Sequence, residues 1–143
     1  MDVINGLLLN YYFISFIFAW IAATVIKSII LSFQGRGFSL KEGFENGGMP
    51  SSHSAVVTAI TMAILLKTGF SEYFFIALVF SSIVISDAFR VRKNLGEQGD
   101  KLNLLLKKSK QKTIEVIYGH SFLQVLAGIL LGIICSLVIY LLY

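Results

Sequence analysis

The stretch Gly47-Gly48-Met49-Pro50-Ser51-Ser52-His53-Ser54 stands where a polar loop enters an apolar run that continues to about Leu66. It holds the only proline of the chain and one of its two histidines. Proline suits the first turn of a helix, where its missing N–H loses no hydrogen bond, so we expect the helix to begin there. The exposed N–H groups of such a turn, with the hydroxyls of Ser51 and Ser52, would form an anion site. His53 would then project toward the bound anion.

The composition indicates an integral membrane protein. Of the 143 residues, 56% are hydrophobic and 14% are charged, whereas charged residues make up about 25% of a soluble domain. This length predicts one domain, 1–143. The start Met1-Asp2 lacks the basic region of a cleavable signal peptide, so we expect the first apolar run to remain as a helix. The lone cysteine, Cys135, excludes a disulfide or a zinc-ligand pattern within one chain.

Four apolar segments predict an all-α fold, a polytopic transmembrane bundle of about four spanning helices. They run from about Leu7 to Phe33, Pro50 to Leu66, Glu72 to Asp87 and His120 to Tyr143. A spanning helix needs about 20 residues. The first and fourth segments are long enough, and the second and third would borrow flanking residues or pack inside the bundle. Residues 34–49 are either a surface loop or a re-entrant segment.

Basic residues predict how this bundle is oriented. Eight of the twelve lie between residues 88 and 112, which we expect to be a loop: Arg90, Arg92, Lys93, Lys101, Lys107, Lys108, Lys110 and Lys112. The positive-inside rule places such a loop in the cytoplasm and both termini outside, with the plasma membrane as the expected location. The polar groups at helix ends then gather at one cytoplasmic face: Lys27, His53, Asp87, Arg92 and His120. We therefore expect a site that faces the cytoplasm.

Small residues recur every four positions on two of the predicted helices: Ala55, Ala59, Ala63, Gly128 and Gly132. Such spacing lets helix backbones approach closely. Packing of the second helix on the fourth would bring His53 and His120 together. The Gly-x-x-x-Gly pattern also leaves a homo-oligomer open.

Two kinds of side chain at this face suit phosphate, lysine and arginine. Lys27 lies inside the end of an apolar helix, where an ammonium needs a partner or a function or snorkels to the headgroups. Arg90 and Arg92 carry guanidinium groups that match phosphate oxygens bidentately, and Asp87 would orient one of them. Positive charges and N–H donors so placed would stabilise a transferring phosphoryl group.

The two histidines supply the reactive groups. His120 and Gln124 are four residues apart at a helix start, hence on one face. The Gln124 carbonyl would hold one imidazole nitrogen so that the other attacks phosphorus, and His53 would protonate the leaving oxygen. Since no acidic cluster stands in the sequence, we expect chemistry without a metal or another cofactor.

These blocks resemble a known family. Residues 47–55, 87–92 and 119–128 are similar to motifs of the divergent branch of the type 2 phosphatidic acid phosphatase superfamily, which also includes the vanadium-dependent haloperoxidases. The resemblance covers about residues 27–132 and implies a phosphohistidine mechanism. It likens Lys27 to the lysine of the first motif. Pro50, Ser52 and His53 resemble the second motif, Pro-Ser-Gly-His, with His53 as general acid. Arg92 and His120 resemble the arginine and nucleophilic histidine of the third motif.

The chain departs from the family pattern at three places. The third-motif arginine and histidine are close in sequence in the parent superfamily, whereas more than twenty residues separate Arg92 from His120 here. Gln124 stands where the family has an orienting carboxylate. A glutamine orients without stabilising an imidazolium by charge, so catalysis would be slower or assisted by Asp87 or Glu115. The third departure concerns the arginine of the first motif, for which Arg36 is only a candidate.

The predicted function is metal-independent hydrolysis of a lipid phosphate at the cytoplasmic leaflet. The expected partners are this substrate and membrane lipids, with no nucleic acid. Two alternatives stay open. A non-catalytic lipid-phosphate binder would need Lys27 and Arg92 but not His120 as a nucleophile, and a small transporter subunit would pair Lys27 with Asp87 as a buried relay. The leucines of the basic loop, at 102 and 104–106, suit either an anionic membrane surface or a solvated loop.

Overall fold

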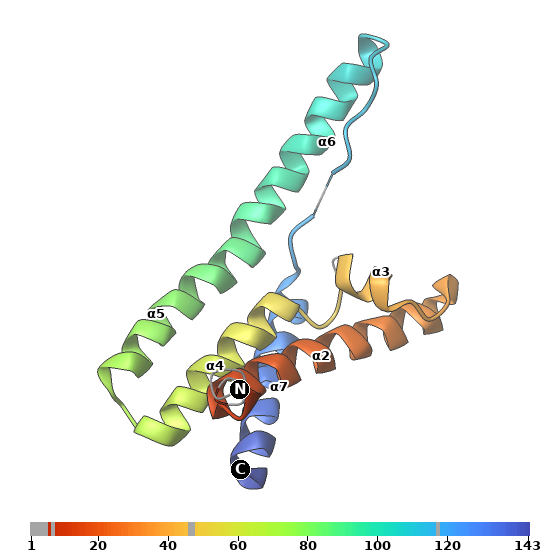
Figure 1. Ribbon diagram of the computed structural model, residues 1–143. Helices are drawn as coiled ribbons and strands as arrows, with labels where there is room; N and C mark the ends of the chain where they lie inside the picture. The colour runs from red at the N-terminus through yellow and green to blue at the C-terminus, as the bar shows by residue number, and fades with distance from the viewer. Residues whose placement is uncertain (1–5, 7, 46–47, 117) are drawn as a thin grey trace.

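The computed structural model describes residues 6, 8–45, 48–116 and 118–143, and this part of the chain consists of helices and connecting loops (Figure 1). The elements are α2 (Tyr11–Leu31), a π-helical turn (Ser32–Arg36), α3 (Leu40–Glu45), α4 (Ser52–Thr68), α5 (Glu72–Ser86), a second π-helical turn (Asp87–Val91), α6 (Arg92–Lys108) and α7 (Phe122–Leu142). The all-α fold is confirmed.

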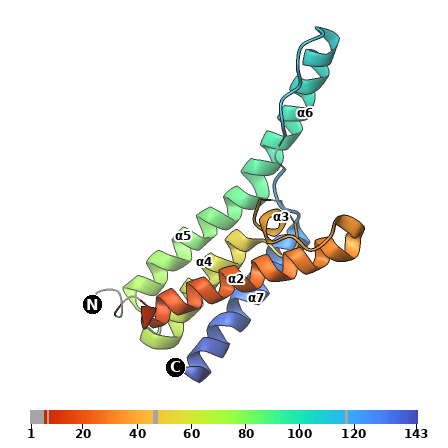
Figure 2. The same cartoon turned by 45° about the vertical axis from the view of Figure 1, so that its right-hand side comes forward.

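Three helical stretches are long and apolar enough to cross a membrane: Tyr11–Gly35, Glu72–Lys108 and Phe122–Leu142. The fourth predicted span is the shorter apolar helix α4, of 17 residues. α4 lies at the centre, since it packs against α2, α5 and α7 (Figures 1 and 2). The chain is therefore a helical membrane bundle with the 17-residue helix α4 at its centre.

The contact between α4 and α7 uses the predicted small residues. A Cβ atom added at Gly128 would collide with the carbonyl oxygen of Ser51, and one at Gly132 with the carbonyl oxygen of Ala55. Further along the same contact, Ala59 and Cys135 are buried against Ala19 of α2. Only residues without bulky side chains permit this approach of backbones. The predicted packing of these two helices is confirmed.

Gly132→Leu is expected to destabilise the bundle by about 1–3 kcal/mol, because overpacking a close contact forces backbone shifts. Thermal unfolding in detergent measures the effect. Leu130→Ile is the matched control, since Leu130 is exposed two positions away on α7. Equal midpoints for the two variants would contradict the close contact of α7 with α4.

The opposite end of the bundle is tied together by one lysine. The Lys67 ammonium lies 4.8 Å from the ring centroid of Tyr11, 5.9 Å from that of Tyr140 and 5.2 Å from that of Tyr143. A cation over an aromatic face is attracted by the ring quadrupole. The start of α2, the end of α4 and the end of α7 are joined here.

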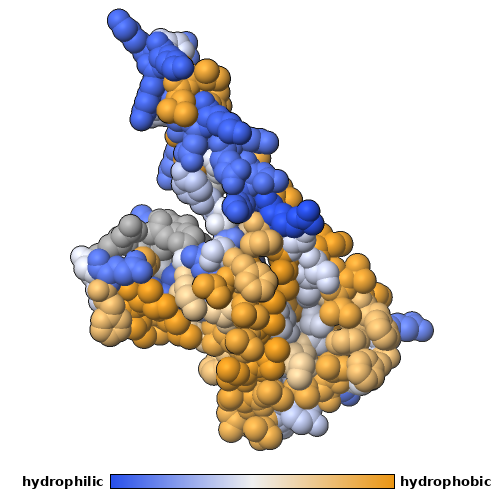
Figure 3. Space-filling model, turned by 180° about the vertical axis from the view of Figure 1, so that it is seen from behind, coloured by the Kyte–Doolittle hydropathy of each residue, from blue (hydrophilic) through white to orange (hydrophobic). Residues whose placement is uncertain are grey.

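The basic segment differs from the prediction of a loop. α5 runs on through the π-helical turn into α6 as one long helix that leaves the bundle (Figure 1). Residues 109–116 and 118 return along α6, and we call α6 with this return segment the arm. Figure 3 shows a hydrophilic arm above an apolar bundle. The helix forms because residues 88–108 contain no proline and are rich in leucine, lysine and other good helix formers.

Side-chain hydrogen bonds hold the two halves of the arm together. The Asn103 amide donates to the Ile114 carbonyl at 2.9 Å and accepts from the Ile114 N–H at 2.8 Å. The Tyr118 hydroxyl donates to the Asp100 carboxylate, 2.7 and 2.8 Å from its two oxygens. The arm is thus a closed hairpin, and its two ends lie next to each other at the bundle.

Between α2 and α4, the described residues include a π-helical turn and the short helix α3. The short helix α3 folds back on the end of α2, where the Ser28 hydroxyl donates to the Ser39 carbonyl at 3.1 Å. A Cβ atom on Gly43 would collide with the Ser28 hydroxyl, so the glycine allows this contact. Gly47 and the Arg36 side chain, both named from the sequence, lie outside what the structure describes.

Candidate active site

The two histidines lie side by side: His53 is in the first turn of α4, and His120 lies two residues before α7 begins. Their ring centroids are 6.2 Å apart, with the ring planes inclined by 54°. The backbone fixes this pairing, because the Ser51 N–H donates to the Gln124 carbonyl at 2.9 Å. One turn below, Gly128 lets α7 lie against the same stretch of α4. Figure 2 shows these two helix starts side by side at the arm end of the bundle.

His120 is held in a defined orientation. It is 8% exposed, and its backbone N–H donates to the Ala88 carbonyl at 3.0 Å. Its Nδ1 lies 3.3 Å from Gln124 Oε1, and that oxygen also accepts the Ser121 N–H at 2.9 Å. The Ser121 bond identifies this atom as the amide oxygen, an acceptor. Nδ1 must therefore carry the proton, which leaves the lone pair on Nε2.

The surroundings of His120 favour the neutral imidazole. Burial lowers the pKa of His120 below its ordinary value, and the neighbouring Lys27, His53 and Arg92 lower it further, whereas the Gln124 hydrogen bond raises it. Desolvation and nearby positive charges both disfavour the imidazolium form. A neutral imidazole with an unprotonated Nε2 is the form that acts as a nucleophile.

Lys27 reaches the same place from α2. It is 3% exposed, and its Nζ donates to Ser52 Oγ at 3.1 Å. Gly48 packs on its stem, since an added Cβ would lie 3.3 Å from Lys27 Cγ. The lysine is therefore buried beside the α4 N-terminus rather than extended toward the headgroups, which answers one question the sequence left open.

Arg92 and Asp87 form an ion pair beside the histidines. Arg92 Nε lies 3.1 Å from Asp87 Oδ2, with the side chains 40% and 45% exposed. The bond uses Nε, and none of the hydrogen bonds among the described residues uses the terminal nitrogens of this guanidinium. Asp87 holds the arginine as the sequence analysis expected. Arg90 lies exposed on the intervening turn, and the contacts described for the cluster do not include it.

The two serines of the motif have different surroundings. Ser51 is fully buried and caps α4: its Oγ accepts the Ser54 N–H at 3.3 Å and the Ser54 hydroxyl at 3.0 Å. Ser52 is half-buried at the Lys27 ammonium. α4 begins at Ser52 and Pro50 precedes its cap. The prediction that Pro50 lies in the first turn of this helix is therefore wrong. The hydroxyl at the site is that of Ser52.

Gly119 has a role that the sequence analysis missed. A Cβ atom there would lie 2.5 Å from the Lys93 nitrogen and 2.9 Å from the Arg92 carbonyl carbon. The residue before His120 thus lies directly against the start of α6. The arm leaves and returns at this point, so Arg92 and His120 are neighbours despite the long insertion. The glycine directly before the histidine was the available signal.

Comparison with known proteins agrees with this arrangement. A profile described as the divergent PAP2 family matches residues 8–135. The chain is 34% identical to YuiD, an uncharacterized membrane protein of Bacillus subtilis (strain 168), over 93% of this chain and 96% of that protein. No solved structure gives a significant match. The chain belongs to the divergent PAP2 family.

Proposed function

We propose that this member of the divergent PAP2 family is a lipid-phosphate phosphatase that works through a phosphohistidine on His120, without a metal. The observation that carries the proposal is the state of His120: its Nδ1 faces a fixed carbonyl oxygen, and Nε2 is left to react. His53 lies 6.2 Å away between ring centroids, and a buried lysine stands beside both. A structural histidine pair would not need that lysine.

The groups around the histidines supply a phosphate site. Lys27 and the terminal nitrogens of Arg92 would meet the non-bridging oxygens, together with the Ser52 hydroxyl. The Ser54 N–H is capped and the Ala55 N–H bonds to the Ser51 carbonyl, so the remaining first-turn amides of α4 belong to Ser52 and His53. These donors would stabilise the charge that spreads over the oxygens in the transition state.

The reaction would proceed in two displacements. His120 Nε2 attacks phosphorus and forms the P–N bond while the bond to the lipid oxygen breaks, and the protonated His53 gives its proton to that oxygen. A water molecule then attacks phosphorus as neutral His53 takes its proton. The P–N bond breaks, inorganic phosphate leaves, and both histidines return to their starting states.

The site would face the cytoplasm. The arm carries most of the basic residues of the chain and rises from the same end of the bundle as the histidines. The retention of positive charge on the cytoplasmic side supports this orientation, and the proposal places the protein in the plasma membrane. The substrate would then be a lipid of the inner leaflet.

Phosphate release by the purified protein tests the proposal. The wild type in detergent, with a chelator present, would be given phosphatidate, phosphatidylglycerophosphate, polyprenyl phosphate and polyprenyl diphosphate. We expect release from at least one. A folded protein that binds these lipids and releases no phosphate would instead be a non-catalytic binder. The transporter reading is less favoured, since the ion pair described for Asp87 is with Arg92.

Gln124 is proposed as a positioning residue for His120, and its substitution should change the pH dependence of kcat/KM. The nucleophile must be neutral and its pKa is lowered, so the acid limb of kcat/KM should lie below about pH 6.5, the ordinary histidine value. Gln124→Glu keeps an acceptor and adds negative charge, which raises the His120 pKa and moves the limb to higher pH. Gln124→Leu should lower kcat about 10²-fold, a typical effect of misplacing a reacting group.

The pH profile distinguishes a Gln124 that orients the His120 imidazole from one that only stabilises the fold. Gln111→Glu, on the exposed end of the arm, is the matched control and should leave the profile where it is. An acid limb that stays in place in Gln124→Glu, or moves to lower pH, would contradict the contact between Gln124 and the reacting imidazole.

A further inference from the structure

We propose that the substrate's hydrocarbon chain lies in a groove between α2 and α5, with α4 as its floor and His53 at its upper end. The proposal rests on the proposed phosphatase function and adds where the lipid part of the substrate binds. Two adjoining cavities make up this groove, and we call it the chain groove. It begins at His53 and runs down the apolar flank of the bundle.

The upper part of the chain groove includes two residues of the phosphate site. It holds about 230 Å³, with Ser52 and His53 at its top, Trp20 on one wall and Val84 on the other. Trp20 is 38% exposed, so this wall also faces the lipid around the bundle. A chain attached to a phosphate at His53 would therefore enter directly from the reaction site.

The lower part continues the same space. It holds about 250 Å³ and shares Phe16, Val56 and Val57 with the upper part, then reaches Ile60 and Phe80. Apolar side chains line most of this length. A hydrocarbon chain gains from leaving water or loosely packed surroundings for such a wall.

The polar atoms at the foot of the groove already have partners. The Thr61 and Ser81 hydroxyls are 2.6 Å apart, so one donates to the other, and both oxygens lie within hydrogen-bond distance of the Val57 carbonyl, at 2.8 and 3.1 Å. A hydroxyl that is bonded inside the protein presents little polarity to a neighbouring chain. The groove is effectively apolar from Val56 downward.

The length of the groove fits one leaflet. From His53 to Thr61 the floor helix rises about 12 Å at about 1.5 Å per residue. Half of a hydrocarbon core of about 30 Å is about 15 Å. A lipid whose phosphate lies at the histidines would therefore extend its chain from the membrane surface to near the bilayer centre, where the groove ends.

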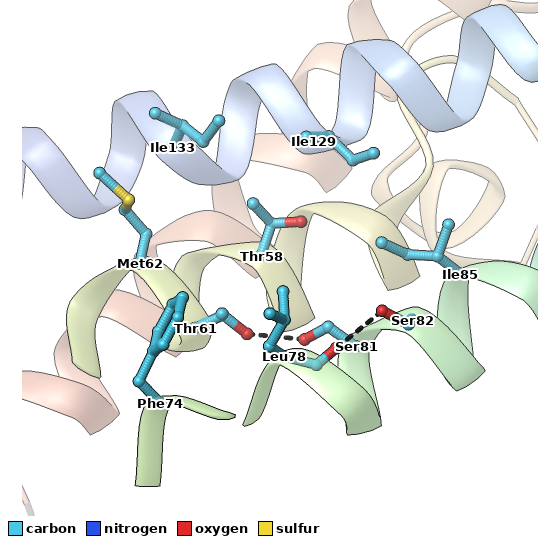
Figure 4. Close-up of a pocket in the computed structure, with 10 residues that line it drawn as sticks. All are labelled: Thr58, Thr61, Met62, Phe74, Leu78, Ser81, Ser82, Ile85, Ile129 and Ile133. Atoms are coloured by element: carbon cyan, nitrogen blue, oxygen red, sulfur yellow. Dashed lines mark hydrogen bonds between the residues drawn. The ribbon is translucent and has the colours of Figure 1, made fainter. Parts of the chain in front are cut away.

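A second groove lies on the other side of α5 and serves as a comparison. It holds about 270 Å³ between α5 and α7, with Thr58, Ile129 and Ile133 among its lining residues (Figure 4). It is slightly larger than either part of the chain groove alone, yet neither His53 nor Ser52 borders it, and it reaches only to Ile85 on α5. α5 packs on α4 between the two grooves, and both grooves border Thr61 and Ser81.

Chain-length selectivity tests the assignment. The kcat/KM for hexadecyl phosphate would be compared with that for phenyl phosphate, which has no chain. Val56→Phe fills the chain groove and is expected to lower the ratio about tenfold or more, the scale on which pocket volume alters selectivity. Ile133→Phe, in the second groove, is the matched control and should leave the ratio at its wild-type value. An unchanged ratio in Val56→Phe, or a fall only in Ile133→Phe, would overturn the proposal.

A labelling experiment gives a readout that does not need turnover. A hexadecyl phosphate with a photoreactive diazirine in mid-chain would be bound to His120→Ala protein, whose groove is unaltered, and the labelled residues mapped by mass spectrometry. We expect label on Phe16, Val57 and Phe80. Label on Ile129 and Ile133, or spread evenly over the outer helix faces, would contradict the chain groove. If the wild type releases phosphate from neither ester, the proposed function fails, while the labelling still decides the groove.

Discussion

His120→Ala is expected to reduce phosphate release by roughly 10⁴-fold or more, the scale on which loss of a covalent nucleophile acts in other enzymes. The reason is local: Nδ1 is committed to Gln124, and Nε2 is the only ring atom left to attack phosphorus. In the proposed mechanism the neighbouring His53 moves the proton, so it would not replace His120 as nucleophile. With a substrate that carries a radioactive phosphate, the released phosphate measures complete turnover. Radioactive protein recovered after a quench without acid measures the phosphohistidine.

His53→Ala provides the comparison for this prediction. Loss of a general acid should slow the cleavage of alkyl phosphates by about 10²–10⁴-fold and have a smaller effect on aryl phosphates, whose leaving oxygen needs no proton. His120→Ala should affect both kinds of ester alike. If His120→Ala keeps wild-type release, or if the trapped phosphoryl group lies on another residue, the phosphohistidine mechanism is wrong.

The spanning segments and their packing could be predicted because they depend on local pattern. Long apolar runs give helices in a membrane whatever their neighbours are, and the structure starts α2, α5 and α7 within a few residues of the predicted positions. The pair Gly128 and Gly132 faces the α4 backbone as expected. One pattern on each helix was enough to bring His53 beside His120.

The proximity of Arg92 to His120 could not be predicted from the sequence alone. A stretch rich in charge between two apolar helices is read as a loop, and nothing in its composition says that its ends meet. The contact depends on tertiary structure: Gly119 against the start of α6, and the His120 N–H on the Ala88 carbonyl. The insertion lengthens the chain without moving Arg92 away from His120.

The neighbouring serines show a similar limit. Ser51 and Ser52 have the same side chain, and either suits a helix N-terminus. Which one caps depends on where the helix begins, and boundaries are the least certain part of a sequence-based assignment. Ser51 is turned inward by its bonds to Ser54 and α7, so Ser52 is the serine of the proposed phosphate site.

Lys27→Met is expected to separate function from stability. The lysine is 3% exposed and bonded to Ser52, and removing one donor to a developing oxyanion typically lowers kcat about 10²–10³-fold. Methionine fills nearly the same volume without a charge to bury. Burying an ammonium group costs free energy of desolvation, and an apolar side chain of similar size does not carry this cost. Activity should therefore fall while the thermal midpoint stays or rises.

Lys67→Met is the matched control, because it makes the same substitution at the opposite end of the bundle. Lys67 is exposed and lies over three tyrosine rings, each such contact contributing about 0.5–1 kcal/mol at an exposed site. This variant should lose stability and keep its phosphate release, the reverse of Lys27→Met. The two outcomes together distinguish a lysine kept for chemistry from one kept for structure. Wild-type activity in Lys27→Met, with a lowered midpoint, would place Lys27 in the second class and remove it from the phosphate site.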